Sequence, residues 1–121
     1  MTKHKSIAIL NASSPYGNSN AKEALDLALI FGSFEQDTSL FFQGDGVRQL
    51  VDKQNPEMIN VKNFLKTLSA LEFYDIENIY LCQDSLTKRN LKSDFHIENV
   101  TLMSKNEFSE KLHQHDVIFR F

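Results

Sequence analysis

The chain has 121 residues, of which 41% are hydrophobic and 24% are charged, and this composition predicts one globular domain over residues 1–121. The formal net charge of −3 argues against a dedicated nucleic-acid-binding protein, and no apolar run approaches the ~18 residues of a membrane span. A single cysteine and the absence of a signal-peptide pattern lead us to expect a cytoplasmic protein.

The first part of the chain alternates between strand and helix patterns. A continuous apolar run over residues 6–11 predicts a strand that is buried on both faces. After a loop, apolar residues at three- and four-residue spacing predict a helix that starts near Ala21 and stops at Gly32-Ser33. A second strand is expected over residues 39–42, and a short helix that ends around Asn55-Pro56 follows it.

The middle of the chain carries a well-marked helix pattern and the single cysteine. Apolar residues recur at three- and four-residue spacing between positions 61 and 71, which predicts one wide apolar helix face. The run Ile79-Tyr80-Leu81 predicts a third strand that stops at Cys82. Residues 85–90 then predict a short helix that ends near a basic turn.

The C-terminal part adds two strands and a helix. Residues 100–103 predict a fourth strand, and Ser104-Lys105-Asn106-Glu107 resembles a capping box that opens a helix carrying Phe108 and Leu112. Residues 116–121 predict a fifth strand. Because strands and helices alternate with connections long enough to cross over, we expect a three-layer α/β/α fold with a mainly parallel five-stranded sheet.

Cys82 is the first candidate for chemistry. At the end of a parallel strand it would lie at the sheet edge where α/β proteins place their sites, and the amides of a following helix would favour a thiolate. Against this, Asp84 lies two residues on and opposes a negative charge, and no basic residue follows before Lys88. Free cysteine is also often buried as a small hydrophobic residue, so the local sequence favours packing over a nucleophilic role.

Two loops on the predicted carboxyl edge of the sheet are weaker candidates for a functional site. Gly44-Asp45-Gly46 follows a strand but lacks the spacing of nucleotide-binding loops, which favours a tight turn over phosphate binding. In that turn we expect Asp45 to cap backbone amides. The Ser13–Asn18 loop lies on the same edge as Cys82, where it forms either one lip of a pocket or a plain connection.

The remaining polar clusters predict neither a metal nor a cofactor site. His113 and His115 could lie on one side of an extended segment, but no third ligand stands at zinc spacing, so a solvated helix end is favoured. Asp75 and Glu77 are two carboxylates in a predicted turn, and neither is expected to act as an acid or base. We therefore expect no metal and no cofactor.

A set of short motifs runs in order along nearly the whole chain. They are Pro15-Tyr16-Gly17, Glu23, Leu25-Asp26, Phe41-Phe42, Asp45-Gly46-Val47, Gln49-Leu50, Tyr74-Asp75-Ile76-Glu77, Cys82, Ser85-Leu86, Arg89 and Asp116-Val117-Ile118-Phe119-Arg120-Phe121. In this order and spacing the chain resembles the TusC/DsrF family, which is part of the DsrE/F/H-like sulfur-relay proteins. The resemblance implies a three-layer α/β/α fold with a parallel five-stranded sheet, in agreement with the alternation of elements.

The resemblance also implies an assembly. TusC-like subunits join TusB-like and TusD-like subunits in a heterohexamer with two copies of each. That complex takes sulfur from a TusA-like carrier and passes it through a TusE-like protein towards 2-thiouridine at the tRNA wobble position. Direct binding of nucleic acid or membrane by this chain is not expected. DsrF uses the same architecture in dissimilatory sulfur oxidation, and this role stays an alternative.

For Cys82 the resemblance implies a structural, non-carrier subunit, because the principal sulfur-accepting cysteine belongs to the TusD/DsrE-type subunit. The alternative is a sulfurtransferase in which Cys82 carries a persulfide and the Ser13–Asn18 loop forms a pocket wall. Ten phenylalanines in so small a chain lead us to expect that some of the rings contact partner subunits.

Overall fold

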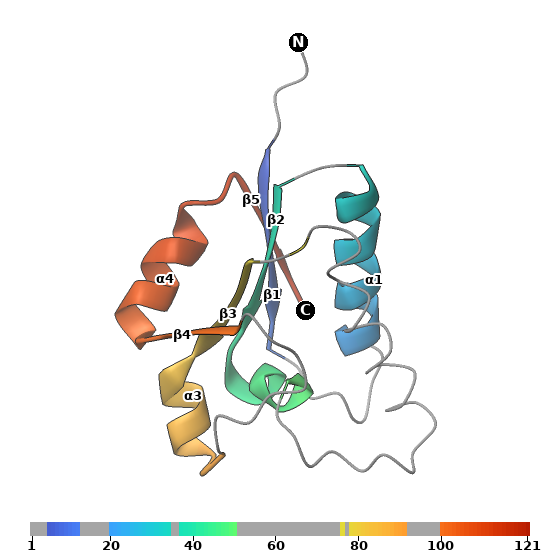
Figure 1. Cartoon of the computed structure of the whole chain (residues 1–121). Helices are drawn as coiled ribbons and strands as arrows, with labels where there is room; N and C mark the ends of the chain where they lie inside the picture. Colours follow the sequence, from blue (N-terminus) through green and yellow to red (C-terminus); the bar gives the residue numbers. More distant parts are fainter. Residues whose placement is uncertain (1–4, 13–19, 35–36, 51–75, 77, 92–99) are drawn as a thin grey trace.

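The computed structural model of the chain contains a five-stranded sheet flanked by helices (Figure 1). It describes residues 5–12, 20–34, 37–50, 76, 78–91 and 100–121. The strand order is β4-β3-β2-β1-β5, and every neighbouring pair in the sheet is parallel. The predicted parallel five-stranded sheet is therefore confirmed.

The strands lie within two residues of where the apolar runs predicted them. β1 spans Ser6–Asn11, β2 spans Asp37–Phe42 and β3 spans Asn78–Cys82. β4 spans Val100–Met103 and β5 spans Val117–Arg120. The inner strands β1 and β2 are almost fully buried, because helices cover both faces of the sheet. The edge strands β4 and β5 are partly exposed.

Helices occupy both faces of the sheet. α1 (Asn20–Ser33) covers one face and α4 (Lys105–His113) covers the other, which confirms the three layers (Figure 1). The 3-10 helix η1 (Gly44–Gln49) follows β2, and the short α3 (Gln83–Lys88) follows β3. The helix predicted between positions 61 and 71 lies outside the described residues. None of the helices described in this structure is long and apolar enough to cross a membrane.

Side chains alternate along each strand between two cores, as the two-residue period of a strand requires. The core on the α1 side includes Ile9, Leu40 and Leu81. The core on the α4 side includes Leu10, Phe41, Cys82, Phe108 and Leu112. Cys82 therefore points to the layer that α4 covers.

α4 is capped by Ser104, the N-cap residue that the capping-box sequence predicted. Ser104 Oγ accepts a hydrogen bond from the backbone amide of Glu107 at 3.3 Å and donates one to Glu107 Oε1 at 2.9 Å. One turn on, the Phe108 ring meets the buried Phe41 ring edge-on, with 5.3 Å between the ring centroids. The cap and this ring contact hold α4 against the sheet.

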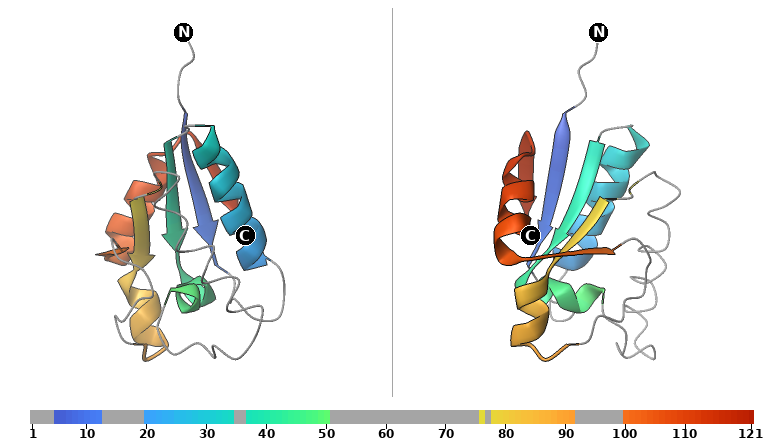
Figure 2. Two further views of the ribbon diagram at one scale, coloured as in Figure 1. Left: turned by 45° about the vertical axis from the view of Figure 1, so that its right-hand side comes forward. Right: turned by 60° about the vertical axis from the view of Figure 1, so that its left-hand side comes forward.

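The carboxyl ends of the strands meet at one edge of the sheet. The arrowheads of β1, β2 and β3 point towards the end where η1 and α3 lie (Figure 2). Cys82 is the last residue of β3, and α3 starts at the next residue. The predicted position of Cys82, at the end of a parallel strand and in front of a helix, is confirmed. This edge is where open parallel sheets place their sites.

Candidate functional site

Cys82 occupies the turn between β3 and α3. Its backbone is extended, with φ −76° and ψ 115°, and it is the N-cap residue of α3. The side chain is only 5% exposed and packs in the core beneath α4 with Leu10, Phe41 and Phe108. Its thiol forms no hydrogen bond with any residue that the structure describes. The cysteine is thus held as a buried, apolar side chain at the sheet edge.

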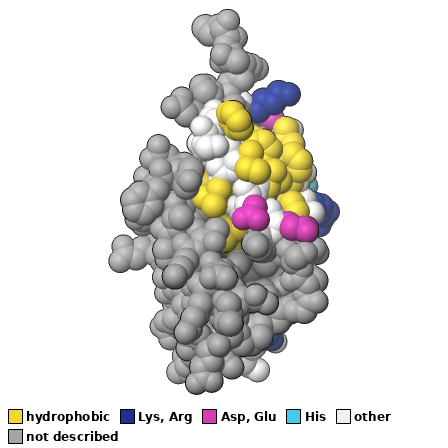
Figure 3. Space-filling view, turned by 90° about the vertical axis from the view of Figure 1, so that its right-hand side faces the viewer, with side chains coloured by type: hydrophobic (Ala, Val, Ile, Leu, Met, Phe, Trp, Pro, Cys, Tyr) yellow, Lys and Arg dark blue, Asp and Glu magenta, His cyan; other side chains and the backbone are white. Residues whose placement is uncertain are grey.

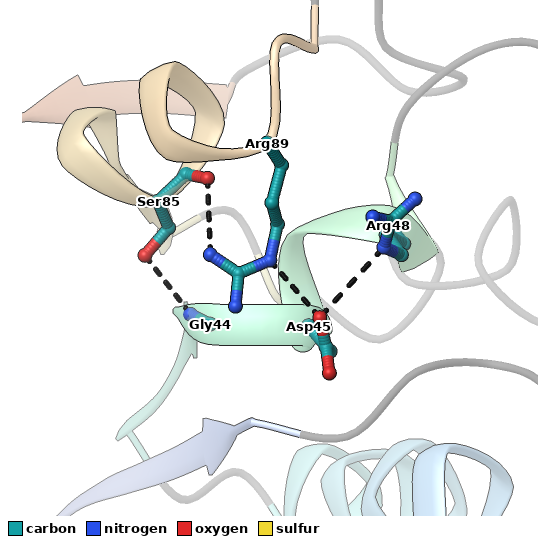
Figure 4. Close-up of polar contacts among 5 residues, drawn as sticks. All are labelled: Gly44, Asp45, Arg48, Ser85 and Arg89. Atoms are coloured by element: carbon teal, nitrogen blue, oxygen red, sulfur yellow. Dashed lines mark hydrogen bonds and ion pairs between the residues drawn. The ribbon is translucent and has the colours of Figure 1, made fainter.

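A polar network ties α3 to η1 beside the β3–α3 turn (Figure 4). The backbone amide of Gly44 donates to Ser85 Oγ at 2.9 Å. Arg89 Nε donates to Asp45 Oδ1 at 3.0 Å, and its Nη1 donates to the carbonyl oxygen of Ser85 at 3.2 Å. Arg48 Nε lies 3.7 Å from the same Asp45 oxygen. Since these contacts join two short helices, they fix the direction in which α3 leaves the sheet.

Among the described residues no backbone amide donates to Asp45, so the expected cap is not found there. The carboxylate accepts a hydrogen bond from Arg89 instead, because the guanidinium of α3 reaches it across the gap to η1. This bond, with the charges of Arg89 and Arg48, holds the pKa of Asp45 below its ordinary value despite the opposing effect of desolvation. With 57% of its side chain exposed, Asp45 is screened by water, and the pairs contribute orientation more than stability.

Gly46 brings η1 into close contact with the end of β1. A Cβ at this position would lie 2.0 Å from the carbonyl oxygen of Asn11, so no larger residue fits there. The same oxygen accepts a hydrogen bond from the amide of Gln43 at 3.0 Å. Gly44 has φ +55°, a left-handed conformation that glycine adopts readily. The predicted tight turn at Gly44-Asp45-Gly46 is confirmed.

A cavity of about 380 Å³ lies between α4 and the carboxyl ends of the strands, and we call it the α4 cavity. Its apolar wall consists of Leu10, Cys82, Phe108, Leu112 and Ile118. Its polar wall consists of Gln43, Lys105, Ser109, His113 and Arg120. Cys82 therefore borders a space that is large enough for a small molecule.

The charged side chains of the α4 cavity are basic. Of the lining residues that the structure describes, Lys105 and Arg120 are charged, and none is an aspartate or glutamate. Lys105 and Arg120 are far from Cys82 along the chain, so the sequence next to the cysteine gave no sign of them. The structure brings Lys105 from the start of α4 and Arg120 from the end of β5. Both follow or end a parallel strand, so the shared carboxyl edge was the signal that could have found them.

Arg120 lies at the far end of the cavity from the cysteine. β2 and β1 separate β3 from β5 in the sheet. At ~4.8 Å per strand, the backbone of Arg120 is roughly 14 Å from that of Cys82. Lys105 instead follows β4, the strand in which Met103 pairs with Cys82. Lys105 is thus the cation on the cysteine side of the cavity.

The two histidines that were weighed as metal ligands are each held by a backbone carbonyl. His113 Nδ1 lies 2.7 Å from the carbonyl oxygen of Ser109, and His115 Nδ1 lies 3.0 Å from that of Lys111. Within the described ranges, no group of three or more histidine, cysteine, aspartate or glutamate side chains could hold a metal ion. Three features weighed from the sequence lie outside the described residues: the Ser13–Asn18 loop, Asp75 and Glu77.

Comparison with known proteins places this geometry in a family. Residues 5–121 match the model described as the DsrE/DsrF-like family. The chain belongs to the DsrE/DsrF-like family. Over 109 residues this DsrE/DsrF-like chain is 36% identical to the "Protein TusC homolog" of Aliivibrio fischeri, a match that covers 90% of the chain and 92% of that protein. The TusC/DsrF resemblance inferred from the motifs is confirmed.

A solved structure supports the fold of the family. The crystal structure of the ychN protein from E. coli matches the DsrE/DsrF-like chain with a TM-score of 0.74. The match covers 97% of this chain and 99% of that one, at 23% sequence identity. At this identity the likeness shows that the two proteins share the fold.

Proposed function

We propose that this DsrE/DsrF-like chain is a subunit of a TusBCD-type sulfur-relay complex. In such a complex persulfide sulfur passes towards 2-thiouridine formation at the wobble position of tRNA. The observation that carries the proposal is the 36% identity to the TusC homolog over 90% of the chain. As such a subunit the chain works in the cytoplasm, as one domain over residues 1–121, and does not contact tRNA itself.

Within the complex the chain is a structural subunit that does not carry sulfur. A carrier must present its sulfur to a donor and then to an acceptor, so the sulfur atom has to be reachable by both proteins. Cys82 is 5% exposed and lies beneath α4. The Ser104 cap and the contact between Phe108 and Phe41 hold that helix in place. Burial therefore supports a packing role for Cys82.

TusB-like and TusD-like subunits complete the complex, with two copies of each subunit, and a TusE-like protein accepts the sulfur. An apolar patch on the α1 side of the molecule supports such an assembly (Figure 3). Phe34 is 70% exposed and Ile30 is 53% exposed at the end of α1. Other described phenylalanines, such as Phe41, Phe42 and Phe108, lie in the core, so Phe34 is the ring that best fits a partner contact.

Deletion of the gene tests the proposal. We expect wobble 2-thiouridine to be lost in tRNA from the deletion strain and restored by the wild-type gene. A tagged chain should purify together with TusB-like and TusD-like subunits, and Phe34→Ser should reduce that recovery. Leu102→Ser is the matched control. Leu102 is also an exposed apolar residue, but it lies on the edge strand β4 and not at the end of α1, which packs on β1 and β2. Unchanged 2-thiouridine in the deletion strain would refute the role and favour sulfur oxidation.

A second candidate function is persulfide carriage on Cys82 itself. One observation favours it: the thiol borders the α4 cavity, where Lys105 is a nearby cation that would stabilise a persulfide anion. In this case the cavity, rather than the outer surface, would admit the sulfur donor. Substitution of Cys82 separates the two roles, because a packing residue is replaceable by serine and a carrier is not.

A further inference from the structure

The α4 cavity has an apolar floor, formed by its apolar wall residues, and a basic rim, formed by Lys105 and Arg120. We propose that it is a binding site for a small organic anion, whose negative charge is attracted by Lys105 and Arg120 from the two ends of the rim and whose hydrocarbon part lies on the floor. No feature of the sulfur-relay role requires such a ligand, and the inference does not depend on that role. Cys82 is only one wall residue of this cavity.

The size and the lining of the cavity fit a small amphipathic molecule. Its volume of about 380 Å³ falls in the range of roughly 300–1,000 Å³ that ligand pockets occupy. Leu10, Phe108 and Ile118 supply apolar surface from β1, α4 and β5. Ligand sites typically pair such surface with a few polar groups that orient the bound molecule. Here those groups include the cations Lys105 and Arg120.

The cations of the rim are not neutralised by the part of the protein that the structure describes. Arg48 and Arg89 both contact the carboxylate of Asp45. In contrast, neither Lys105 nor Arg120 forms an ion pair with any described residue. Unpaired cations beside a partly enclosed apolar space attract anions more strongly than fully solvated ones do.

The acidic residue next to Lys105 in sequence does not cancel its charge inside the cavity. Glu107 is turned back onto Ser104, with 2.9 Å between Glu107 Oε1 and Ser104 Oγ, and it is not a lining residue. At the opposite side, Arg120 presents a planar guanidinium, which matches the two oxygens of a carboxylate or sulfonate. The rim therefore selects for negative charge from two elements, α4 and β5.

Cys82 is the single cysteine of the chain, so its rate of modification measures whether the cavity favours anionic over cationic reagents. The full chain is treated with 2-sulfonatoethyl methanethiosulfonate, an anion, or with its trimethylammonioethyl analogue, a cation. The Cys82 thiolate attacks the sulfenyl sulfur, a disulfide forms, methanesulfinate leaves, and the thiol proton goes to the buffer. Relative to a free small thiol, we expect the anionic reagent to be favoured by at least roughly tenfold at low salt.

Variants that remove one positive charge show which residues cause the preference for the anionic reagent. Lys105→Gln and Arg120→Gln should each reduce the preference for the anionic reagent. Lys88→Gln is the matched control, because it removes the same charge from α3 at about 9 Å along the helix from Cys82 and does not line the cavity. An unchanged preference in both cavity variants, or an equal drop in the control, would overturn the proposal.

A non-covalent probe tests binding without relying on the reactivity of Cys82. Benzenesulfonate and its neutral analogue benzenesulfonamide are titrated into isotope-labelled full chain, and amide shifts are followed by NMR. We expect shifts at cavity residues such as Ser109 and Ile118 with benzenesulfonate, and at least tenfold weaker binding of the sulfonamide. The double variant of Lys105→Gln and Arg120→Gln should lose the binding. Equal affinity for both probes, or no binding of either, would refute the site.

Discussion

Replacing Gly46 by alanine should destabilise the fold by roughly 1–5 kcal/mol. The new Cβ would lie 2.0 Å from the carbonyl oxygen of Asn11, where ordinary contacts begin near 3.4 Å, so η1 must move away from β1. That overlap costs about 1–3 kcal/mol. The movement also weakens the bond from Gln43 to the same oxygen, which costs about 1–3 kcal/mol at a buried residue. The lower unfolded-state entropy of alanine returns only about 0.4–1 kcal/mol.

Urea unfolding of both proteins, followed by circular dichroism, measures this difference in the free energy of unfolding. Gly44→Ala is the matched control, because its Cβ would have no atom nearer than 3.8 Å and its cost arises from φ +55° alone, about 1–2 kcal/mol. Gly44→Asn should recover part of that cost, since asparagine tolerates left-handed backbone. A loss below about 1 kcal/mol at Gly46, or a larger loss at Gly44, would refute the steric reasoning.

Three further substitutions test the packing around the site. Asp45→Asn should lower stability at neutral pH, and the difference should vanish in acid. The folded-state pKa of Asp45 lies below its ordinary value of 3.8. The stability from its ion pairs is therefore present above pH 3.8 and is lost as the pH falls through the folded-state pKa. Urea unfolding of both proteins over the acid range measures this difference. Ser104→Ala removes the N-cap of α4 and should cost about 1 kcal/mol in thermal or urea unfolding, and no loss would show that the cap is unimportant. Phe41→Ala removes a fully buried ring beneath α4 and should cost about 3–5 kcal/mol by the same measurement, whereas a loss near that of a surface substitution would contradict the packing.

Short-range patterns predicted the elements well because the residues responsible for them are near neighbours in the chain. The apolar runs matched β1 and β4 residue for residue, and the capping box predicted the start of α4. The second strand begins at Asp37, earlier than the apolar run at 39–42 indicated. Its first residues are polar, and they join the sheet because β1 offers them pairing partners.

The surroundings of the site could not be predicted in this way. Arg89 and Asp45, which form an ion pair, are 44 positions apart in the chain. From its nearest neighbours in the sequence, Asp45 was expected to cap backbone amides. The position of Cys82 was predictable from the strand that ends there. The carboxyl edge also places Lys105 and Arg120 on the same side of the sheet, but how far each lies from Cys82 depends on the order of the strands. Strand order depends on long-range pairing, which no local pattern encodes.

We propose that this chain supports a sulfur-relay complex without carrying sulfur on Cys82. The most direct measurement is wobble 2-thiouridine in tRNA from cells carrying Cys82→Ser, together with recovery of the partner subunits on the tagged variant. The account predicts that the complex assembles and that 2-thiouridine persists, because serine replaces a buried side chain of similar size. Loss of 2-thiouridine with normal assembly would contradict it and would put Cys82 on the path of the sulfur.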